Sequence, residues 1–155
     1  MSESKVIFRD GRIENDSWCH LDDVTSADDP SRATVPLERF LESEIQYGGI
    51  RLPNTANVDS LKGQLEQVKL VTIDFPKFTD GRGYTLARDL RVHLNYQGEL
   101  RAVGDITRDQ LLYLSRCGFD AYILKAGKDP DDAVRAFREQ SIRYQPELRS
   151  TSNVQ

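Results

Sequence analysis

The chain has 155 residues, of which 38% are hydrophobic and 30% are charged, and its formal charge at pH 7 is −4. This composition predicts one soluble domain with a modest core. Its 21 basic residues are dispersed among 25 acidic ones, which argues against nucleic acid or an anionic membrane as a partner. The sequence contains neither an apolar run of about 18 residues nor a basic and apolar leader, so we expect a cytoplasmic protein with no membrane contact.

The N-terminal residues predict a small β-hairpin followed by an acidic loop. Lys5–Phe8 and residues 12–14 flank an Asp-Gly pair, which is a hairpin signal. A third short strand is expected over Trp18–Leu21, and Asp22–Ala33 is rich in acidic and turn-forming residues. We therefore expect three parts: a hairpin with an acidic loop (1–34), an α/β domain (35–146) and a frayed tail (147–155).

Helices and strands alternate from residue 35 onward. The first helix is expected over Val35–Glu44, with Pro36 at its first position, and a short strand over Ile50–Pro53. Asn57 is expected to cap a second helix, whose apolar face would be Leu61, Leu65 and Val68.

The strand expected over Lys69–Phe75 is apolar on both faces, as is typical of a central strand. After it come further helices and strands, expected at Leu86–Leu94, Glu99–Gly104, Arg108–Cys117 and Asp120–Leu124, and a final helix that begins near Pro130. The pattern predicts an α/β fold with about four parallel strands in successive βα units, as an open or half-barrel-like sheet, preceded by the hairpin. Loops after parallel strands gather at the C-terminal edge of the sheet, where ligands usually bind.

Local signals mark both ends of the helix that follows Ile106. Thr107 and Gln110 have the spacing of a capping box. Gly118 suits a left-handed position after the helix, where Phe119 could fold back on Leu114 in a Schellman motif.

Residues 80–121 carry a resemblance to a known family. The matching residues are Asp80-Gly81-Arg82-Gly83-Tyr84-Thr85-Leu86-Ala87, Leu90-Arg91, Gly98-Glu99-Leu100-Arg101-Ala102-Val103-Gly104-Asp105, Asp109-Gln110 and Arg116-Cys117-Gly118-Phe119-Asp120-Ala121. Together they closely resemble a bacterial family of unknown function whose members are usually described as probable oxidoreductases of sulfite reduction, encoded beside assimilatory sulfite reductase. Tyr84-Thr85 replaces the Phe-Ser usual in that family and keeps an aromatic ring and a hydroxyl group.

The resemblance implies a role in sulfur assimilation. One hypothesis is an accessory protein or subunit that docks on sulfite reductase or its electron donor, through the Asp80–Tyr84 loop and the arginine-rich helices. The alternative is a small enzyme that binds an oxyanion or a phosphorylated ligand at the C-terminal edge of the sheet. No redox-cofactor motif is present, so we expect no cofactor. The sequence leaves open whether the protein is an enzyme and whether it forms a homodimer.

Asp80, Gly81, Arg82 and Gly83 are the first group of candidate ligand- or partner-binding residues. They precede a helix, where free N–H groups favour anions. A tight loop with a paired aspartate would explain the same residues.

Arg101, Asp105 and Asp109 are the second group. Arg101 lies inside a strand and needs a partner, whereas the arginines on the helices are expected to be mostly solvated. Asp105 and Asp109 lie one helical turn apart, so their carboxylates could face one another, with Lys77 or Lys125 nearby; this suits acid–base chemistry or helix capping.

No catalytic residue can be identified. Cys117 precedes a helix-ending glycine, where the helix dipole raises the pKa of a thiol. Cys19, Cys117, His20 and His93 are too widely spaced to predict a metal site.

Overall fold

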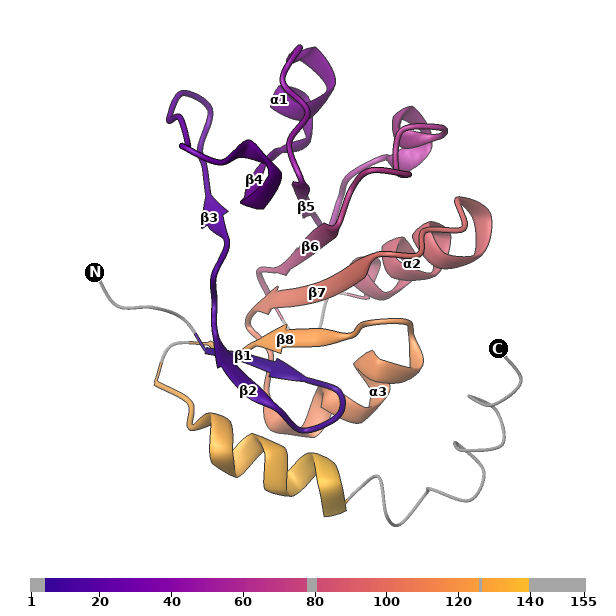
Figure 1. Cartoon of the computed structure of the whole chain (residues 1–155). Coiled ribbons are helices and arrows are strands. Elements are labelled where there is room, and N and C mark those ends of the chain that lie inside the picture. Colours follow the sequence, from indigo (N-terminus) through magenta and orange to yellow (C-terminus); the bar gives the residue numbers. More distant parts are fainter. Residues whose placement is uncertain (1–4, 78–80, 126, 140–155) are drawn as a thin grey trace.

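The computed structural model describes residues 5–77, 81–125 and 127–139, and its centre is a curled sheet of eight strands (Figure 1). The strands are β1 (Lys5–Phe8), β2 (Ile13–Asn15), β3 (Cys19–His20), β4 (Ala33–Pro36), β5 (Gly49–Pro53), β6 (Leu70–Phe75), β7 (Glu99–Gly104) and β8 (Ala121–Ile123). Their order across the sheet is β2-β1-β8-β7-β6-β5-β4-β3. The strands from β3 to β8 are parallel, and β1 runs antiparallel to both β2 and β8.

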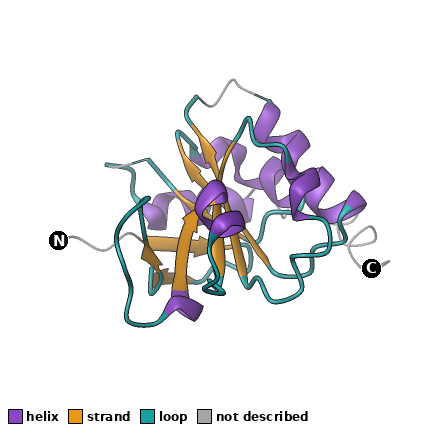
Figure 2. Cartoon of the chain, turned by 90° about the horizontal axis from the view of Figure 1, so that it is seen from above, coloured by secondary structure: helices purple, strands orange, loops and turns teal. Residues whose placement is uncertain are grey.

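Short helices follow most of the parallel strands. The α-helices of the described residues are α1 (Leu37–Glu42), α2 (Arg82–Arg88), α3 (Leu111–Arg116) and a fourth over residues 130–139. Helix α2 continues into a π-helical segment, η3 (Asp89–His93), and single 3₁₀ turns occur at η1 (Pro30–Arg32), η2 (Val58–Leu61) and η4 (Arg108–Gln110). Seen from above, the strands stand in the middle and the helices lie around them (Figure 2). None of these helices combines the length and the apolar character that crossing a bilayer requires.

The prediction of about four parallel strands in successive βα units is wrong. Six strands are parallel, and the hairpin does not stand apart from them, because β1 pairs with β8. Strands β3 and β4 extend the sheet beyond β5. The curl of the sheet agrees with the half-barrel form of the prediction (Figure 1).

The segment expected to begin the first helix is instead an extended strand. Val35 and Pro36 belong to β4 and pair with Ile50 and Arg51 of β5, so α1 begins only at Leu37. Proline has no N–H group, but it can end a strand whose hydrogen bonds end with it. Because proline is also typical of a first helical turn, the predicted helix begins two residues too early.

The second expected helix is a single 3₁₀ turn. Asn57 caps it as predicted, because its side chain accepts a hydrogen bond of 2.9 Å from the N–H of Asp59. The turn ends at Leu61, and Gly63 follows with a φ of +82°, which no right-handed helix allows. The apolar residues at 61, 65 and 68 are buried nonetheless.

Several other local predictions are confirmed, but the helix expected over Leu86–Leu94 begins at Arg82 and is π-helical over Asp89–His93. The tail expected over residues 147–155 lies outside the described residues. Gly11 forms the hairpin turn with a φ of +98°, and β5, β6 and β7 begin within one residue of their expected positions. Gln110 accepts the N–H of Thr107 at 2.9 Å in a capping box. Gly118 has a φ of +112°, and Phe119 donates its N–H to Leu114 in the Schellman pattern.

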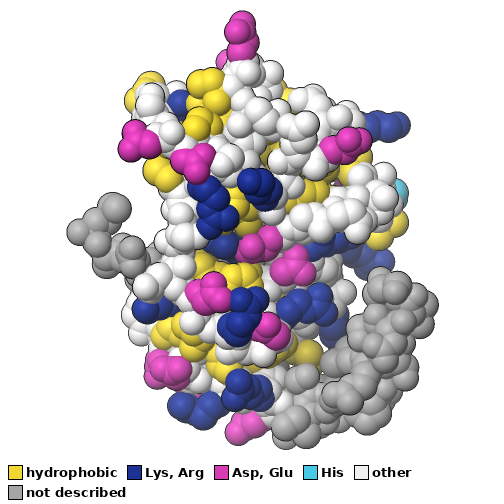
Figure 3. All heavy atoms as spheres, in the orientation of Figure 1, with side chains coloured by type: hydrophobic (Ala, Val, Ile, Leu, Met, Phe, Trp, Pro, Cys, Tyr) yellow, Lys and Arg dark blue, Asp and Glu magenta, His cyan; other side chains and the backbone are white. Residues whose placement is uncertain are grey.

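The two faces of the sheet differ in character. The outer face is apolar and packs under the helices, with fully buried side chains from β6 and β7 at Val71, Ile73, Leu100 and Ala102. Burial of each large side chain contributes about 2 kcal/mol. The inner face carries Arg51, Thr72 and Arg101, which are neighbours in register on β5, β6 and β7. Charged side chains of both signs run down the middle of the molecule in the orientation of Figure 1 (Figure 3).

A three-residue link joins the two edges of the sheet. Strands β2 and β3 lie at opposite edges, yet only Asp16, Ser17 and Trp18 separate them in sequence. Such a link spans at most about 14 Å, so the edges must approach one another. The link therefore crosses the inner face of the curled sheet at one end.

Candidate functional site

Arg101 lies on the inner face of β7 and is neutralised by two carboxylates. Its guanidinium contacts Asp16 Oδ1 at 3.1 Å and Glu99 Oε2 at 2.8 Å, and its side chain is only 3% exposed. The partner that the sequence analysis required for Arg101 is therefore present. Burial would penalise this cation strongly if the carboxylates were absent.

Asp16 continues the network toward the edge strand β3. Its second oxygen lies 2.6 Å from His20 Nε2, and His20 Nδ1 lies 2.7 Å from the hydroxyl of Thr34 on β4. Burial raises the pKa of Asp16, but hydrogen bonds from His20 and the Trp18 N–H and the positive charges nearby outweigh it and lower the pKa to about 2. Sequence reasoning missed this network, because nothing local links Asp16 to β7.

The C-terminal edge of the sheet brings Asp105 and Lys125 together. Asp105 follows β7, Lys125 follows β8, and their charged groups lie 3.8 Å apart. Of the two lysines expected near Asp105, Lys125 is the one that this contact brings close. Asp74, at the end of neighbouring β6, has a raised pKa because burial desolvates its carboxyl group.

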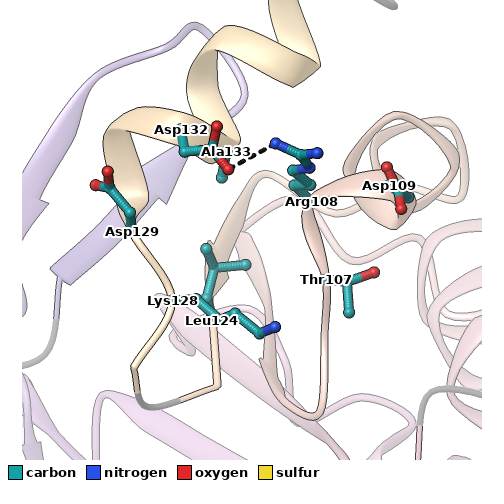
Figure 4. Close-up of a pocket in the computed structure, with 8 residues that line it drawn as sticks. All are labelled: Thr107, Arg108, Asp109, Leu124, Lys128, Asp129, Asp132 and Ala133. Carbon is teal, nitrogen blue, oxygen red and sulfur yellow. Dashed lines mark hydrogen bonds and ion pairs between the residues drawn. The ribbon is translucent and has the colours of Figure 1, made fainter.

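A pocket of about 390 Å³ lies beside this pair, between the loops that follow β7 and β8. Its lining residues are Thr107, Arg108, Asp109, Leu124, Lys128, Asp129, Asp132 and Ala133. Arg108 and Asp132 point toward one another and form an ion pair of 2.7 Å between η4 and the helix over residues 130–139 (Figure 4). The predicted residue Asp109 thus lines this pocket, and Asp105 is not among its lining residues.

Gly81 and Gly83 lie where α2 begins, and they differ in how closely other residues surround them. A Cβ atom at Gly83 would come within 2.5 Å of the Phe75 ring. Gly81 has an ordinary φ of −79°, and a Cβ there would meet no described atom within 4 Å. Arg82 is exposed in the first turn of α2, and Asp80 lies outside the described residues.

The predicted residues lie at two parts of the sheet. Asp105 and Asp109 lie near the C-terminal edge, Arg101 lies on the inner face, and Gly81, Arg82 and Gly83 begin α2. Helix α2 follows β6, so Gly81 to Gly83 also lie at the C-terminal edge of the sheet, as expected for segments that follow parallel strands. Among the described residues no group of three or more His, Cys, Asp and Glu side chains could hold a metal ion.

Aromatic rings form a row from the core to the surface between α2 and α3. Tyr84 lies 5.3 Å from Phe75 and 4.9 Å from Tyr113, measured between ring centroids. Gln110 donates a hydrogen bond of 3.1 Å to the Tyr84 hydroxyl. Cys117 lies beside these rings, and burial raises the pKa of its thiol. A raised pKa leaves little thiolate at neutral pH.

Comparison with known proteins identifies one family. Residues 49–154 match the family model described as "Bacterial protein of unknown function (DUF934)". The matched range includes β5 to β8 and both helices that flank the aromatic row. No curated protein matches the chain. The chain belongs to this bacterial family of unknown function.

Proposed function

We propose that the protein is an accessory factor of assimilatory sulfite reduction that docks on sulfite reductase or its electron donor. Its resemblance over residues 80–121 to proteins encoded beside sulfite reductase supports the pathway. Multi-electron reduction of sulfite requires metal or flavin chemistry, which a docked enzyme would supply.

The ion pairs of Arg101 and Asp105 favour an accessory role over a catalytic one. Arg101 is buried between two carboxylates, and Asp105 forms an ion pair with Lys125. The charge of a guanidinium held in this way is compensated inside the protein, which leaves little of it for a sulfite ion. The arrangement favours a scaffold that presents its outer surface to a partner.

A deletion strain tests the pathway. We expect the strain to fail on sulfate and on sulfite as sole sulfur sources and to grow on sulfide or cysteine, because the block lies at sulfite reduction. Growth on sulfate would contradict the proposed role in sulfite reduction. A matched strain that carries the gene on a plasmid controls for effects on neighbouring genes.

A reconstituted assay tests the accessory role. The purified chain should reduce no sulfite with any electron donor and should raise turnover when it is added to sulfite reductase and its donor. Sulfite reduction by the isolated chain would replace the accessory role with an enzymatic one.

A second candidate function is a small enzyme of sulfur assimilation. The pocket beside the Asp105–Lys125 pair and the raised pKa of Asp74 favour it, because perturbed carboxyl groups often mark sites of proton transfer. Calorimetric titration with sulfite, sulfate and adenylylsulfate tests this alternative. Heat of binding that is lost in Asp105→Asn would support it.

A further inference from the structure

We propose that the outer face of α2, η3 and α3 is a docking surface for a protein partner that presents carboxylates around an apolar recess. We call this surface the α2–α3 face, and it consists of Tyr84, Arg88, Val92, Tyr113 and Arg116. The proposal rests on the accessory role proposed above and adds to it the contact residues and the chemistry of the partner.

Two large apolar side chains are exposed on the α2–α3 face. Tyr113 is 55% exposed and Val92 is 69% exposed. Tyr113 is also held in position, since its ring packs edge-on against Tyr84, which in turn packs against the buried Phe75. An exposed tyrosine that is already ordered loses little conformational entropy when it enters a recess. Tyr113 therefore has the properties of a binding hot spot.

Two arginines flank the tyrosines. Arg116 follows Tyr113 by three residues and Arg88 follows Tyr84 by four, and these spacings place each pair on one side of its helix. Both arginines are exposed, and no carboxylate of the described residues lies within 4.0 Å of either one. The positive charges of both arginines favour the Cys117 thiolate, although burial has the larger effect and raises the pKa of the thiol.

The charges of this face determine what it can bind. A guanidinium without an ion pair gains charge-assisted hydrogen bonds when a carboxylate approaches, because no internal pair has to break. Two such groups beside an ordered aromatic ring match an acidic protein surface. A long polyanion such as nucleic acid would need more cations than this, and the chain as a whole has a charge of −4.

Variants of the full chain test the surface in a binding assay with purified sulfite reductase and, separately, with its purified electron donor. Arg88→Glu with Arg116→Glu should weaken binding to one of the two by about tenfold or more, and Tyr113→Ala should do the same. Tyr113→Phe, which keeps the ring, and Arg135→Glu, a charge reversal at an exposed position on the helix over residues 130–139, should change affinity by less than about twofold. Equal affinity of all variants would overturn the docking surface.

Photo-crosslinking in cells separates a failure of the surface from a failure of the pathway. A photoreactive phenylalanine analogue that replaces Tyr113 should form an adduct with an Asp- and Glu-rich peptide of sulfite reductase or its electron donor. The same analogue in place of Arg135 is the control. An adduct with an acidic peptide of an unrelated protein would support the docking surface and contradict the proposed pathway. No adduct specific to position 113, or an adduct with nucleic acid, would remove the surface.

Discussion

Asp16 and Arg101 are 85 residues apart in sequence and form an ion pair of 3.1 Å across the inner face of the sheet. Asp16 belongs to the link between the two edge strands, and Arg101 belongs to the central strand β7. The pair therefore fastens the link that joins the edges to the middle of the sheet. Both side chains are buried, at 7% and 3% exposed, so solvent screens the pair very little.

Removal of this contact should destabilise the protein strongly. Asp16→Ala leaves Arg101 buried with Glu99 alone and should lower the free energy of unfolding by about 3 kcal/mol. Urea unfolding followed by circular dichroism measures the loss. Asp10→Ala is the matched control, because Asp10 pairs with Arg12 at the surface, and it should cost no more than about 0.5 kcal/mol.

The Asp16 carboxylate should make the free energy of unfolding depend on pH in the acidic range. The pKa of Asp16 is about 2 in the folded protein, below the ordinary value of 3.8, so its contribution is complete above pH 3.8 and is lost as the pH falls toward 2. The wild type should lose about 2 kcal/mol more over this interval than Asp16→Asn, which has no charge to titrate. Parallel pH profiles for the two proteins would contradict the low pKa.

The sequence contains enough local information to predict much of the sheet but not its extent. β6 and β7 are apolar enough, and β7 is bounded clearly enough by Gly98 and Asp105, to be predicted nearly to the residue. β4 was missed because it is four residues long and ends in Pro36, which also suits the start of a helix. β4 is a strand because it pairs with β5, and its own four residues do not reveal that pairing.

The arginines illustrate the same limit. A position inside a strand indicates that Arg101 needs a partner, but its position in the sequence does not reveal that the partner is Asp16. Arg91, one of the arginines expected on a mostly solvated helix face, instead donates to the carbonyls of Tyr96, Gly98 and Gly118 and to the Asp120 carboxylate. Arg91 and Arg101, which both belong to the family resemblance, therefore form contacts within the protein.

Arg91→Lys should cost about 2 kcal/mol, because one ammonium group cannot reach the acceptors that the planar guanidinium reaches together. Thermal and urea unfolding measure this loss. Arg88→Lys, on the exposed face of the same helical segment, should change stability by less than about 0.5 kcal/mol. Similar stability of the two variants would show that the Arg91 contacts contribute nothing.

The left-handed glycine after α3 should tolerate no side chain. Gly118 has a φ of +112°, and a Cβ atom there would lie 2.8 Å from Arg91 Cγ. Gly118→Ala should therefore lose about 2 kcal/mol or more, since backbone strain and displacement of Arg91 add. Gly63 has a similar φ of +82°, but a Cβ atom there would meet no described atom within 4 Å. Gly63→Ala should therefore lower the free energy of unfolding by only about 1 kcal/mol.

The loop that begins α2 should matter for function more than for stability. Arg82 is exposed, and Gly81 is a glycine that neither its backbone conformation nor its described neighbours require. A glycine of this kind lets another backbone or a ligand approach closely. We therefore expect Asp80→Ala combined with Arg82→Ala to abolish growth of the complemented deletion strain on sulfate. Stability should fall by less than about 0.5 kcal/mol, because Arg82 is exposed and substitutions of exposed residues usually cost little. Arg135→Ala, which removes an exposed arginine from a different helix, should complement fully. A double variant that also complements fully would eliminate this loop as a contact site and would leave the α2–α3 face as the docking surface.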